Sequence, residues 1–280
     1  MKNIIATILL LFAFSGFSQN VGQTGKDTAV WNYTDINKMK QGKWLKFDKK
    51  TKKKLYEGYF ENDRPVGEFK RYHKNGKYSA IMFFEKNSTR IRAKFYYDNG
   101  NLAAEGIYSK ENIKDSTWTF YGTDKALIAR ETYKNGVKHG KSLKFYRSKN
   151  KNGEPILSEE LNYIDGKREG EWKQYFENGS IKLKTSYKKD MVDGYYTFNL
   201  ETGSVYCMGN YRKGLKEGEW YYWNEPGKKT IIHFKKGIPD NQKEYSKIID
   251  KELKEAEKNK NKIKEPDQMM NSPEKYFMGE

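Results

Sequence analysis

The chain has 280 residues, of which 36% are hydrophobic and 15% aromatic, and its formal net charge is +17. This composition is too polar for a thick hydrophobic core, yet too rich in aromatic residues for an intrinsically disordered chain. A thin sheet studded with aromatic rings satisfies both constraints. The basic balance favours an acidic protein, an anionic lipid surface or an acidic polysaccharide as partner. The competing interpretation of the charge is a solvated, lysine-rich outer face.

Residues 1–18 have the pattern of a secretory signal peptide. Lys2 supplies a positive start, residues 4–14 form an apolar run, and residues 15–18 form an exit rich in small residues. The apolar run is too short to span a bilayer, and no cysteine follows it to carry a lipid anchor. We therefore expect an exported protein that is periplasmic, at the cell surface or secreted, and neither lipid-anchored nor transmembrane. Export disfavours nucleic acid as a partner.

From Gly42 onward the sequence repeats a unit of roughly 24 residues, and such self-similarity is typical of repeat architectures. A clear copy opens with glycine, has an aromatic residue two positions later and a second aromatic residue three positions after that. The eight units start at Gly42, Gly67, Ile91, Ser116, Gly140, Gly170, Gly194 and Gly218. They close on Phe60, Phe84, Tyr108, Tyr133, Tyr163, Tyr187, Tyr211 and Phe234. We predict a β-repeat array over residues 42–238, preceded by an N-terminal lead over residues 19–41.

Each unit has the signals of a β-hairpin. The pair Asn178-Gly179 separates two segments of alternating polarity, and Asn-Gly favours a two-residue hairpin turn because both residues accept positive φ. The strand that follows presents one side to the core: Ile181, Leu183, Thr185 and Tyr187. Cys207 occupies the matching column of the seventh unit, so we expect it to be buried. As the single cysteine of the chain, it forms no intramolecular disulfide.

The first strand of a unit does not alternate strictly. Trp172 and Tyr175 are three residues apart, which places them on opposite faces of a regular strand. The sequence therefore predicts either a bulge in this strand or aromatic rings on both faces. A lone hairpin buries too little apolar surface to offset the entropy lost on ordering, so the units must stack. The predicted fold is all-β: an elongated antiparallel sheet of about eight tandem hairpins.

Residues 239–280 predict a charged helix followed by a mobile tail. Tyr245, Ile248, Ile249, Leu253 and Ala256 recur at helical spacing and indicate an amphipathic helix over residues 241–262. Its apolar stripe is expected to cover the terminal edge of the sheet, and the competing interpretation is a solvated helix. Near its end the tail contains Tyr276, Phe277 and Met278, which are unusually apolar for a free end.

The pattern Gly-Glu-Trp-x-x-Tyr-x-x-Asn-Gly at residues 170–179, followed by a two-faced strand and Tyr-x-x-Gly, resembles the MORN repeat variant of bacterial proteins. The resemblance covers residues 42–237 and implies tandem antiparallel hairpins. It also implies an association with membrane surfaces or scaffolding, and some members of the family are labelled antitoxin-like. The motif brings no catalytic residues. The chain departs from it at Ile91, Ser116 and Ser142, so irregular third to fifth units are expected.

The sequence offers no recognisable catalytic or cofactor site. His73, His139 and His233 lie in different units, and none is within metal-ligand spacing of another histidine or of the cysteine. The mature chain has neither a Gly-rich phosphate loop nor a Gly-x-Ser-x-Gly nucleophile motif. Acidic residues are plentiful, but nothing singles out a catalytic pair. We expect a protein that is not an enzyme and that uses no cofactor and no metal.

Two features are candidates for a binding surface. The fifth unit carries an insertion whose polar residues include Lys149, Lys151 and Asn152, placed at a hairpin tip where contacts often concentrate. The second feature is a lysine-flanked row of rings that could stack on sugars or on a partner: Trp44, Trp118, Trp172 and Trp220. The competing interpretations are a neutral insertion and a row of core positions.

These observations favour a non-catalytic exported repeat protein that acts as a protein-binding or scaffolding surface at the cell envelope, with an unknown protein as its partner. One alternative is a peripheral binder of anionic lipid or glycan. The other, which rests on the family resemblance alone, is an antitoxin-like neutraliser of a partner toxin.

Overall fold

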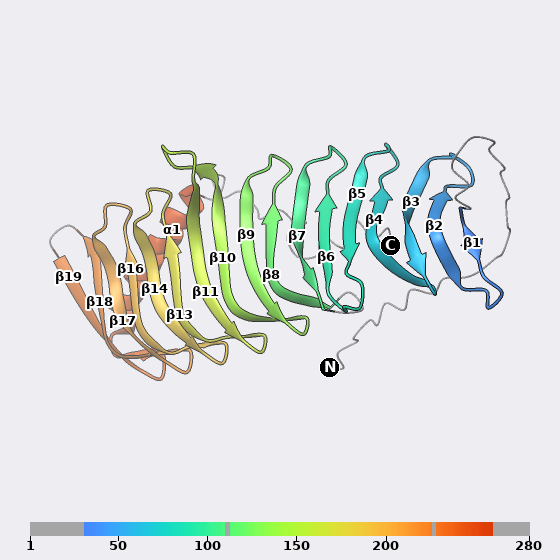
Figure 1. Ribbon diagram of the computed structural model, residues 1–280. Helices are drawn as coiled ribbons and strands as arrows, with labels where there is room; N and C mark the ends of the chain where they lie inside the picture. The colour runs from blue at the N-terminus through green and yellow to red at the C-terminus, as the bar shows by residue number, and fades with distance from the viewer. Residues whose placement is uncertain (1–30, 110–112, 226–227, 260–280) are drawn as a thin grey trace.

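A computed structural model describes residues 31–109, 113–225 and 228–259. In these ranges the chain forms one long open antiparallel sheet with a single helix near its C-terminal end (Figure 1). This confirms the predicted all-β fold of tandem hairpins. Among the described helices, none is long and apolar enough to cross a membrane. The predicted signal peptide and residues 19–30 of the predicted lead lie outside the described residues.

The strands follow one another through the sheet in chain order, each paired with the next, except that β11 pairs with both β12 and β13 and β14 with both β15 and β16. The first half contains β1 (Tyr33–Thr34), β2 (Lys40–Phe47), β3 (Lys54–Glu61), β4 (Arg64–Tyr72), β5 (Tyr78–Phe84), β6 (Ile91–Tyr96), β7 (Leu102–Tyr108), β8 (Lys114–Tyr121), β9 (Leu127–Lys134) and β10 (Val137–Lys149). The second half contains β11 (Pro155–Ile164), β12 (Lys167–Arg168), β13 (Gly170–Tyr175), β14 (Ile181–Lys188), β15 (Met191–Val192), β16 (Gly194–Asn199), β17 (Val205–Arg212), β18 (Leu215–Glu225), β19 (Lys228–Lys235) and β20 (Ile238–Pro239). The helix is α1 (Gln242–Asn259).

Of the two alternatives predicted for the first strand of a unit, aromatic rings on both faces is the one that occurs, and the bulge lies in the second strand. Gln174 lies opposite Leu183, but the next residue, Tyr175, lies opposite Ile181, so β14 carries one extra residue in a bulge. The same shift recurs at the matching position of the first four units. Within β13 the side chains alternate regularly, so Trp172 packs against the closing ring of its unit while Tyr175, three residues later, lies on the other face. The expected burial of Ile181 is wrong, because the bulge leaves it 38% exposed.

The face that carries the closing rings is called the core face, and the opposite face the open face. All eight closing rings lie on strands, and each is buried or half-buried, as the stacking argument requires. The first core cluster comprises Ala80, Met82, Ala93, Phe95, Tyr97, Ala103, Ala104, Tyr108, Trp118, Phe120, Ile128 and Ala129. The second core cluster comprises Cys207, Trp220, Tyr222, Ile232, Phe234 and Ile248. Cys207 is buried, as predicted.

Large rings on the core face fit against small residues of the preceding strand. The indole of Trp118 lies against Gly106, where a β-carbon would be 2.3 Å from the ring. Its Nε1–H donates to the carbonyl oxygen of the next residue, Ile107, at 3.0 Å. Because Gly106 has no side chain, the ring packs close to the backbone. The hydrogen bond to Ile107 satisfies the one polar atom of the ring.

The units that depart from the repeat motif remain hairpins. Ser116 adopts the positive φ of 58° that glycine adopts at the start of most other units. Ile91 has no positive φ, and β5 pairs with β6 without a register shift. The register shift that marks a bulge at the start of a unit is therefore absent from the third unit. The fourth unit has this bulge, although serine adopts a positive φ less readily than glycine.

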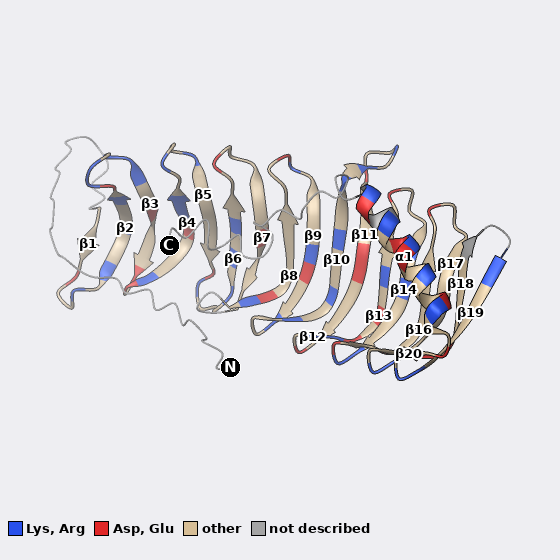
Figure 2. Cartoon of the chain, turned by 180° about the vertical axis from the view of Figure 1, so that it is seen from behind, with Lys and Arg blue, Asp and Glu red and all other residues tan. Residues whose placement is uncertain are grey.

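The helix α1 crosses the core face over the last units, as Figure 2 shows from behind. Ile248 is fully buried there, and the ring of Tyr245 lies 5.1 Å from that of Phe234. The prediction that the helix covers the terminal sheet edge is therefore wrong: it covers the face. The edge is protected by Asp240, whose N–H donates to the carbonyl oxygen of His233 while its carboxylate accepts from the His233 N–H.

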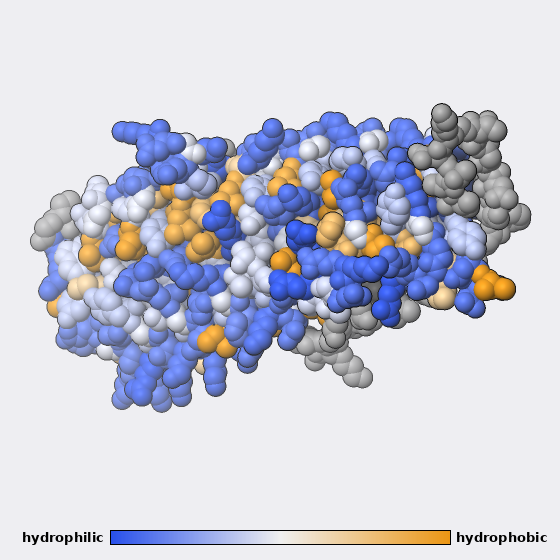
Figure 3. Space-filling view, in the orientation of Figure 1, coloured by the Kyte–Doolittle hydropathy of each residue, from blue (hydrophilic) through white to orange (hydrophobic). Residues whose placement is uncertain are grey.

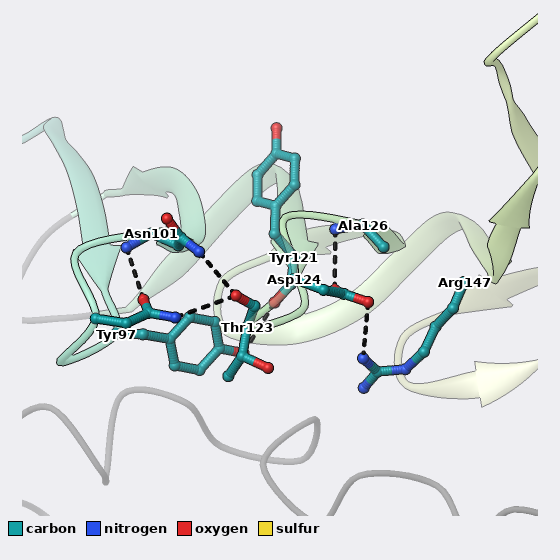
Figure 4. A network of polar contacts seen from close by, with 8 residues as sticks. Tyr97, Asn101, Tyr121, Thr123, Asp124, Ala126 and Arg147 are labelled. Carbon is teal, nitrogen blue, oxygen red and sulfur yellow. Dashed lines mark hydrogen bonds and ion pairs between the residues drawn. The ribbon is translucent and has the colours of Figure 1, made fainter.

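Side chains tie the hairpin tips of one margin together (Figure 4). The hydroxyl of Tyr97 donates to the carbonyl oxygen of Tyr121 on the next tip at 2.9 Å. Two asparagine amides of the first tip donate to the carbonyl oxygen of Thr123, and Asp124 pairs with Arg147 of the following tip at 3.2 Å. Contacts of this kind couple each unit to its neighbour, as expected of a one-dimensional array.

Candidate binding surfaces

The four tryptophans predicted as a stacking row all lie on the core face, on β2, β8, β13 and β18. Trp118 and Trp220 are 0% and 1% exposed, so neither ring has a face left on which a ligand could stack. The structure therefore moves these two from the candidate surface to the core. Trp44 and Trp172 are half-buried.

A cation covers the outer face of the buried tryptophan rings. The ammonium of Lys216 lies 4.3 Å from the centre of the Trp220 ring and donates to the hydroxyls of Tyr222 (2.8 Å) and Tyr245 (3.1 Å). Lys114 lies 5.1 Å from the centre of the Trp118 ring. An ammonium over an aromatic face is attracted to it, most strongly where water is excluded. These lysines are therefore part of the core.

These core cations occupy one column, two residues before the start of a unit, and the sequence analysis missed this signal. The column contains Lys40, Lys114, Lys138, Arg168 and Lys216, each over at least one aromatic ring. Burial lowers the pKa of Lys40, and the nearby Asp63 carboxylate partly opposes this shift. The cations of this column, which flank the rings in the sequence, contact those rings and are therefore not available to a partner.

The core face becomes polar in its middle, at the fifth and sixth units. Leu161 occupies the column that holds glycine beneath Trp118 and Trp220, and the Nε1–H of Trp172 beside it is buried. The carboxylate of Glu159 pairs with Lys144 at 2.8 Å in the same region. Ser142, where the repeat expects an aromatic ring, is buried. This region separates the two core clusters.

Lys149, Lys151 and Asn152 lie at the tip of the long hairpin formed by β10 and β11, as predicted, and all three are exposed. The tip is closed by bonds from the backbone N–H groups of Asn152 and Glu154 to the side chain of Asn150. The structure does not bring this tip together with the tryptophans, because those lie within the strands on the core face. The predicted residues therefore form no single site.

The open face carries a line of large apolar side chains in partly solvated positions. Tyr59, Phe83, Tyr195 and Ile231 each directly precede a core-face residue of their strand, so they point to the opposite side. All four are exposed, and Tyr195 is 54% exposed. Figure 3 shows hydrophobic side chains gathered in a broken band along the middle of this face, between hydrophilic margins. Sequence reasoning missed this line because it concentrated on the tryptophans.

Polar contacts between tyrosine and glutamate separate these apolar positions. The hydroxyl of Tyr121 donates to Glu105 at 2.9 Å, and Lys94 pairs with the same carboxylate at 3.6 Å. Burial, together with this hydrogen bond to a carboxylate, raises the pKa of Tyr121 to about 12. Tyr72 with Glu57 repeats the contact, as does Tyr175 with Glu160. Much of the charge within the open face is thereby neutralised inside the protein.

Exposed cations gather instead along one margin of the open face, named here the basic margin. In five successive turns an exposed cation lies directly opposite an exposed aliphatic residue in the ladder. The pairs are Lys134 with Val137, Lys167 with Ile164, Lys188 with Met191, Arg212 with Leu215, and Lys235 with Ile238. Opposite residues share a face, so cation and aliphatic side chain project together. Lysines and arginines colour this row of turns in Figure 2.

The last three of these turns add a second lysine in a strained position. Lys189, Lys213 and Lys236 have φ of 49°, 51° and 50°, a conformation that favours asparagine or glycine. Their backbone N–H groups donate to the side chains of Glu169, Asp193 and Glu217 respectively. These carboxylates hold the turns in shape, while all three lysine side chains are exposed.

Three segments of the chain match the MORN repeat variant family: residues 65–86, 91–110 and 168–189. The described parts of these segments coincide with the hairpins β4–β5 and β6–β7 and with the hairpin of β12, β13 and β14. The matches and the observed hairpins support a MORN-repeat architecture in these segments. A comparison with curated proteins found no match. Within the described ranges, no group of three or more His, Cys, Asp or Glu side chains is placed to hold a metal ion.

Proposed function

We propose that this protein is exported and is a non-catalytic scaffold of MORN-type repeats that holds a partner protein against its open face at the cell envelope. The observation that carries the proposal is the line of exposed apolar side chains on that face, which no element of the described residues covers. Exposed apolar side chains between polar margins are typical of protein interfaces. The partner has an apolar patch rimmed by acidic residues, complementary to the net charge of +17.

The test is affinity capture from the native envelope with three forms of the full chain. In the first variant, Tyr195→Ser and Ile231→Ser remove two exposed side chains of the open face. The control variant, Leu200→Ser and Leu253→Ser, removes two exposed apolar side chains from a hairpin tip and from α1. We expect one envelope protein to bind the wild type and the control variant but not the open-face variant. The same protein, once purified, should show the same selectivity. Equal capture by all three forms would contradict the proposal.

The basic margin supports a second candidate function, peripheral attachment to an anionic lipid surface. Aliphatic side chains at turn tips can enter the headgroup region while the neighbouring cations attract anionic lipid. Strand spacing places successive turns of this margin roughly 9.5 Å apart, so five turns form a row of about 40 Å. Glycan binding is less favoured at this margin, because it presents aliphatic side chains rather than aromatic stacking faces.

Flotation with phosphatidylserine-containing vesicles tests this second function. Replacing Lys189, Lys213 and Lys236 with glutamine is expected to weaken binding about 100-fold, at roughly 1 kcal/mol for each cation near an anionic surface. The matched control replaces Lys49, Lys52 and Lys74 at the opposite margin and changes the net charge equally. Binding that does not depend on lipid charge or salt concentration, or that weakens equally in both variants, would exclude the basic margin as the membrane contact.

An antitoxin-like role rests on the resemblance alone, since no described residue indicates a toxin. Co-expression with the product of a neighbouring gene that is toxic when expressed alone would test it, and failure to restore growth would dismiss it.

A further inference from the structure

A second apolar feature of the open face runs across the strands. Each strand from β4 to β11, and then β13 and β14, places one ring or aliphatic side chain in the same row. Tyr96 and Tyr121 directly follow the core residues Phe95 and Phe120, so they point to the open face. The two members from one hairpin lie opposite each other in the ladder and share that face. This cross-strand row comprises Tyr72, Tyr78, Tyr96, Leu102, Tyr121, Leu127, Phe145, Leu157, Tyr175 and Ile181.

The rings of the cross-strand row are held in place by the strand before them. The hydroxyl of Tyr121 donates to Glu105 in β7 at 2.9 Å, so its ring leans toward the preceding unit. The ring of Phe145 has the guanidinium of Arg130, in β9, 5.9 Å from its centre. Most members of the row are half-buried, Ile181 is 38% exposed, and no element of the described residues lies over them. Side chains that are already fixed lose little conformational entropy when a partner covers them.

The spacing of the cross-strand row matches the turn of an α-helix laid across the strands. Adjacent strands are about 4.8 Å apart, and the apolar stripe of an amphipathic helix advances about 5.4 Å for each turn, a mismatch of about 0.6 Å. An extended segment places same-side residues about 6.7 Å apart, a mismatch of about 1.9 Å at every contact. Nine strand spacings amount to about 43 Å, which is the length of a helix of about 29 residues.

The sheet already binds one helix in this manner on its other face. There α1 lies across the strands of the last units (Figure 2). Tyr245 and Ile248, three residues apart, contribute its contact: Ile248 belongs to the second core cluster, and the ring of Tyr245 lies 6.2 Å from that of Tyr222. The repeat therefore accommodates the helical spacing of three to four residues across its strands.

The charge around the cross-strand row is asymmetric. On the side of the basic margin, the next open-face positions include the exposed cations Lys94, Arg130 and Lys184. The side chains of Lys94 and Lys184 are 55% and 52% exposed even though each pairs with a glutamate. The hairpin tips on the other side are mixed, with Asp124 in one tip and Lys149 in the next. A helix with acidic residues along one flank fits this arrangement, because complementary charge sets the orientation of a partner.

We propose that the cross-strand row is the docking site for an amphipathic α-helix of the partner protein. The helix lies across the strands, packs an apolar stripe at positions i, i+3, i+4 and i+7 on the row, and turns an acidic flank toward the basic margin. This inference rests on the proposed function and narrows it, because it names the element of the partner that the open face recognises.

Synthetic peptides of about 29 residues test the helix directly, with binding to the full chain measured by fluorescence anisotropy. The first peptide has leucines at helical spacing and glutamates along one flank. The second has the same residues rearranged to alternate as in a strand, and the third has lysines in place of the glutamates. We expect the first peptide to bind at least about tenfold more tightly than the others. Equal binding of the first peptide and either of the others, or no binding of the first, would overturn the proposal.

A variant of the protein locates the site. Leu157→Gln with Ile181→Gln removes two aliphatic members of the cross-strand row and is expected to weaken binding of the first peptide about tenfold or more. The control, Leu200→Gln with Leu253→Gln, changes two exposed leucines outside the row and should leave binding unchanged. Equal binding to both variants would overturn the proposal. So would self-association of the chain that only the row variant abolishes, since the row would then bind a second copy.

Photocrosslinking with the wild type supplies a readout that does not depend on how a variant folds. A benzophenone in the apolar stripe of the first peptide is expected to crosslink to the row in β8 to β11, for example to Leu127. Crosslinks confined to the core face or to the hairpin tips would overturn the proposal. The capture experiment fails separately: a captured envelope protein without peptide binding would reject the helix alone, whereas peptide binding without a captured protein would reject the scaffold.

Discussion

The indole of Trp220 lies against Gly209 of the neighbouring strand so closely that a β-carbon on Gly209 would be 2.3 Å from the ring. The Nε1–H of the same ring donates to the carbonyl oxygen of Asn210 at 3.1 Å. Glycine in this column is therefore a packing requirement rather than a turn signal, since Gly209 has no positive φ. The fit between the large ring and the missing side chain fixes how two successive units pack.

Gly209→Ala is expected to destabilise the protein by about 1–3 kcal/mol, because the added methyl group overpacks a closed contact. Urea unfolding followed by tryptophan fluorescence measures the loss. Adding Trp220→Phe, which replaces the indole by a smaller ring, should make the double variant less destabilised than the sum of the two single changes. Strict additivity would show that the two residues are not coupled through this contact.

Ser116→Gly and Ile91→Gly should shift stability in opposite directions, although both restore the repeat motif. Ser116 has a positive φ of 58°, so glycine there is expected to stabilise by about 1 kcal/mol. Ile91 lies in a regular ladder and packs against the first core cluster, so glycine should destabilise. Thermal unfolding of the two variants tests this contrast. Stabilisation by Ile91→Gly would mean that the third unit has the bulge after all.

Lys216→Met keeps the length of the side chain but removes its charge from the rings around it. We expect a loss of about 1–2 kcal/mol from the cation–π contacts, with the two tyrosine hydroxyls also losing their partner. Lys213→Met, three residues earlier and exposed, serves as the control and should change stability by less than about 0.5 kcal/mol. Equal effects in denaturant unfolding would place Lys216 outside the core.

Cys207 should react slowly with thiol reagents in the native protein, because burial raises its pKa to about 12. An unfolded chain ionises near the ordinary value of 9.0, so the thiol contributes stability below that pH and loses the contribution as pH rises from 9 toward 12. Comparing urea unfolding of the wild type and Cys207→Ala across this range isolates the effect. Rapid labelling of the native thiol at pH 8 would contradict the burial.

The sequence was sufficient to predict the hairpins, because Asn-Gly turns and a two-residue period leave few alternatives for the second strand of a unit. It also located the column of closing rings. The spacing of Trp172 and Tyr175 predicted rings on both faces, but the bulge in β14 opposite Gln174 and its consequence for Ile181 could not be predicted from it. A bulge adds a residue to one strand and so changes which side chains face the core.

The binding surface could be predicted less well, because burial in a one-layer sheet depends on what lies over it. Trp118 and Trp220 resemble a ligand platform in the sequence, but a glycine on the preceding strand and a lysine four residues earlier on their own strand make them part of the core. The placement of α1 on the face, rather than on the edge, likewise depends on which rings Tyr245 and Ile248 reach. The column of cations and the basic margin become apparent only when equivalent positions of successive units are compared.

Hydroxyl-radical footprinting of the free and partner-bound protein tests the central claim, that the open face of one continuous sheet is the binding surface. In the free protein we predict strong oxidation at Tyr59, Phe83 and Tyr195 and protection of Trp118 and Trp220. Addition of the partner isolated from the native envelope should protect the open-face residues. Strong labelling of the two tryptophans in the free protein, or partner protection confined to residues outside the open face, would contradict the account.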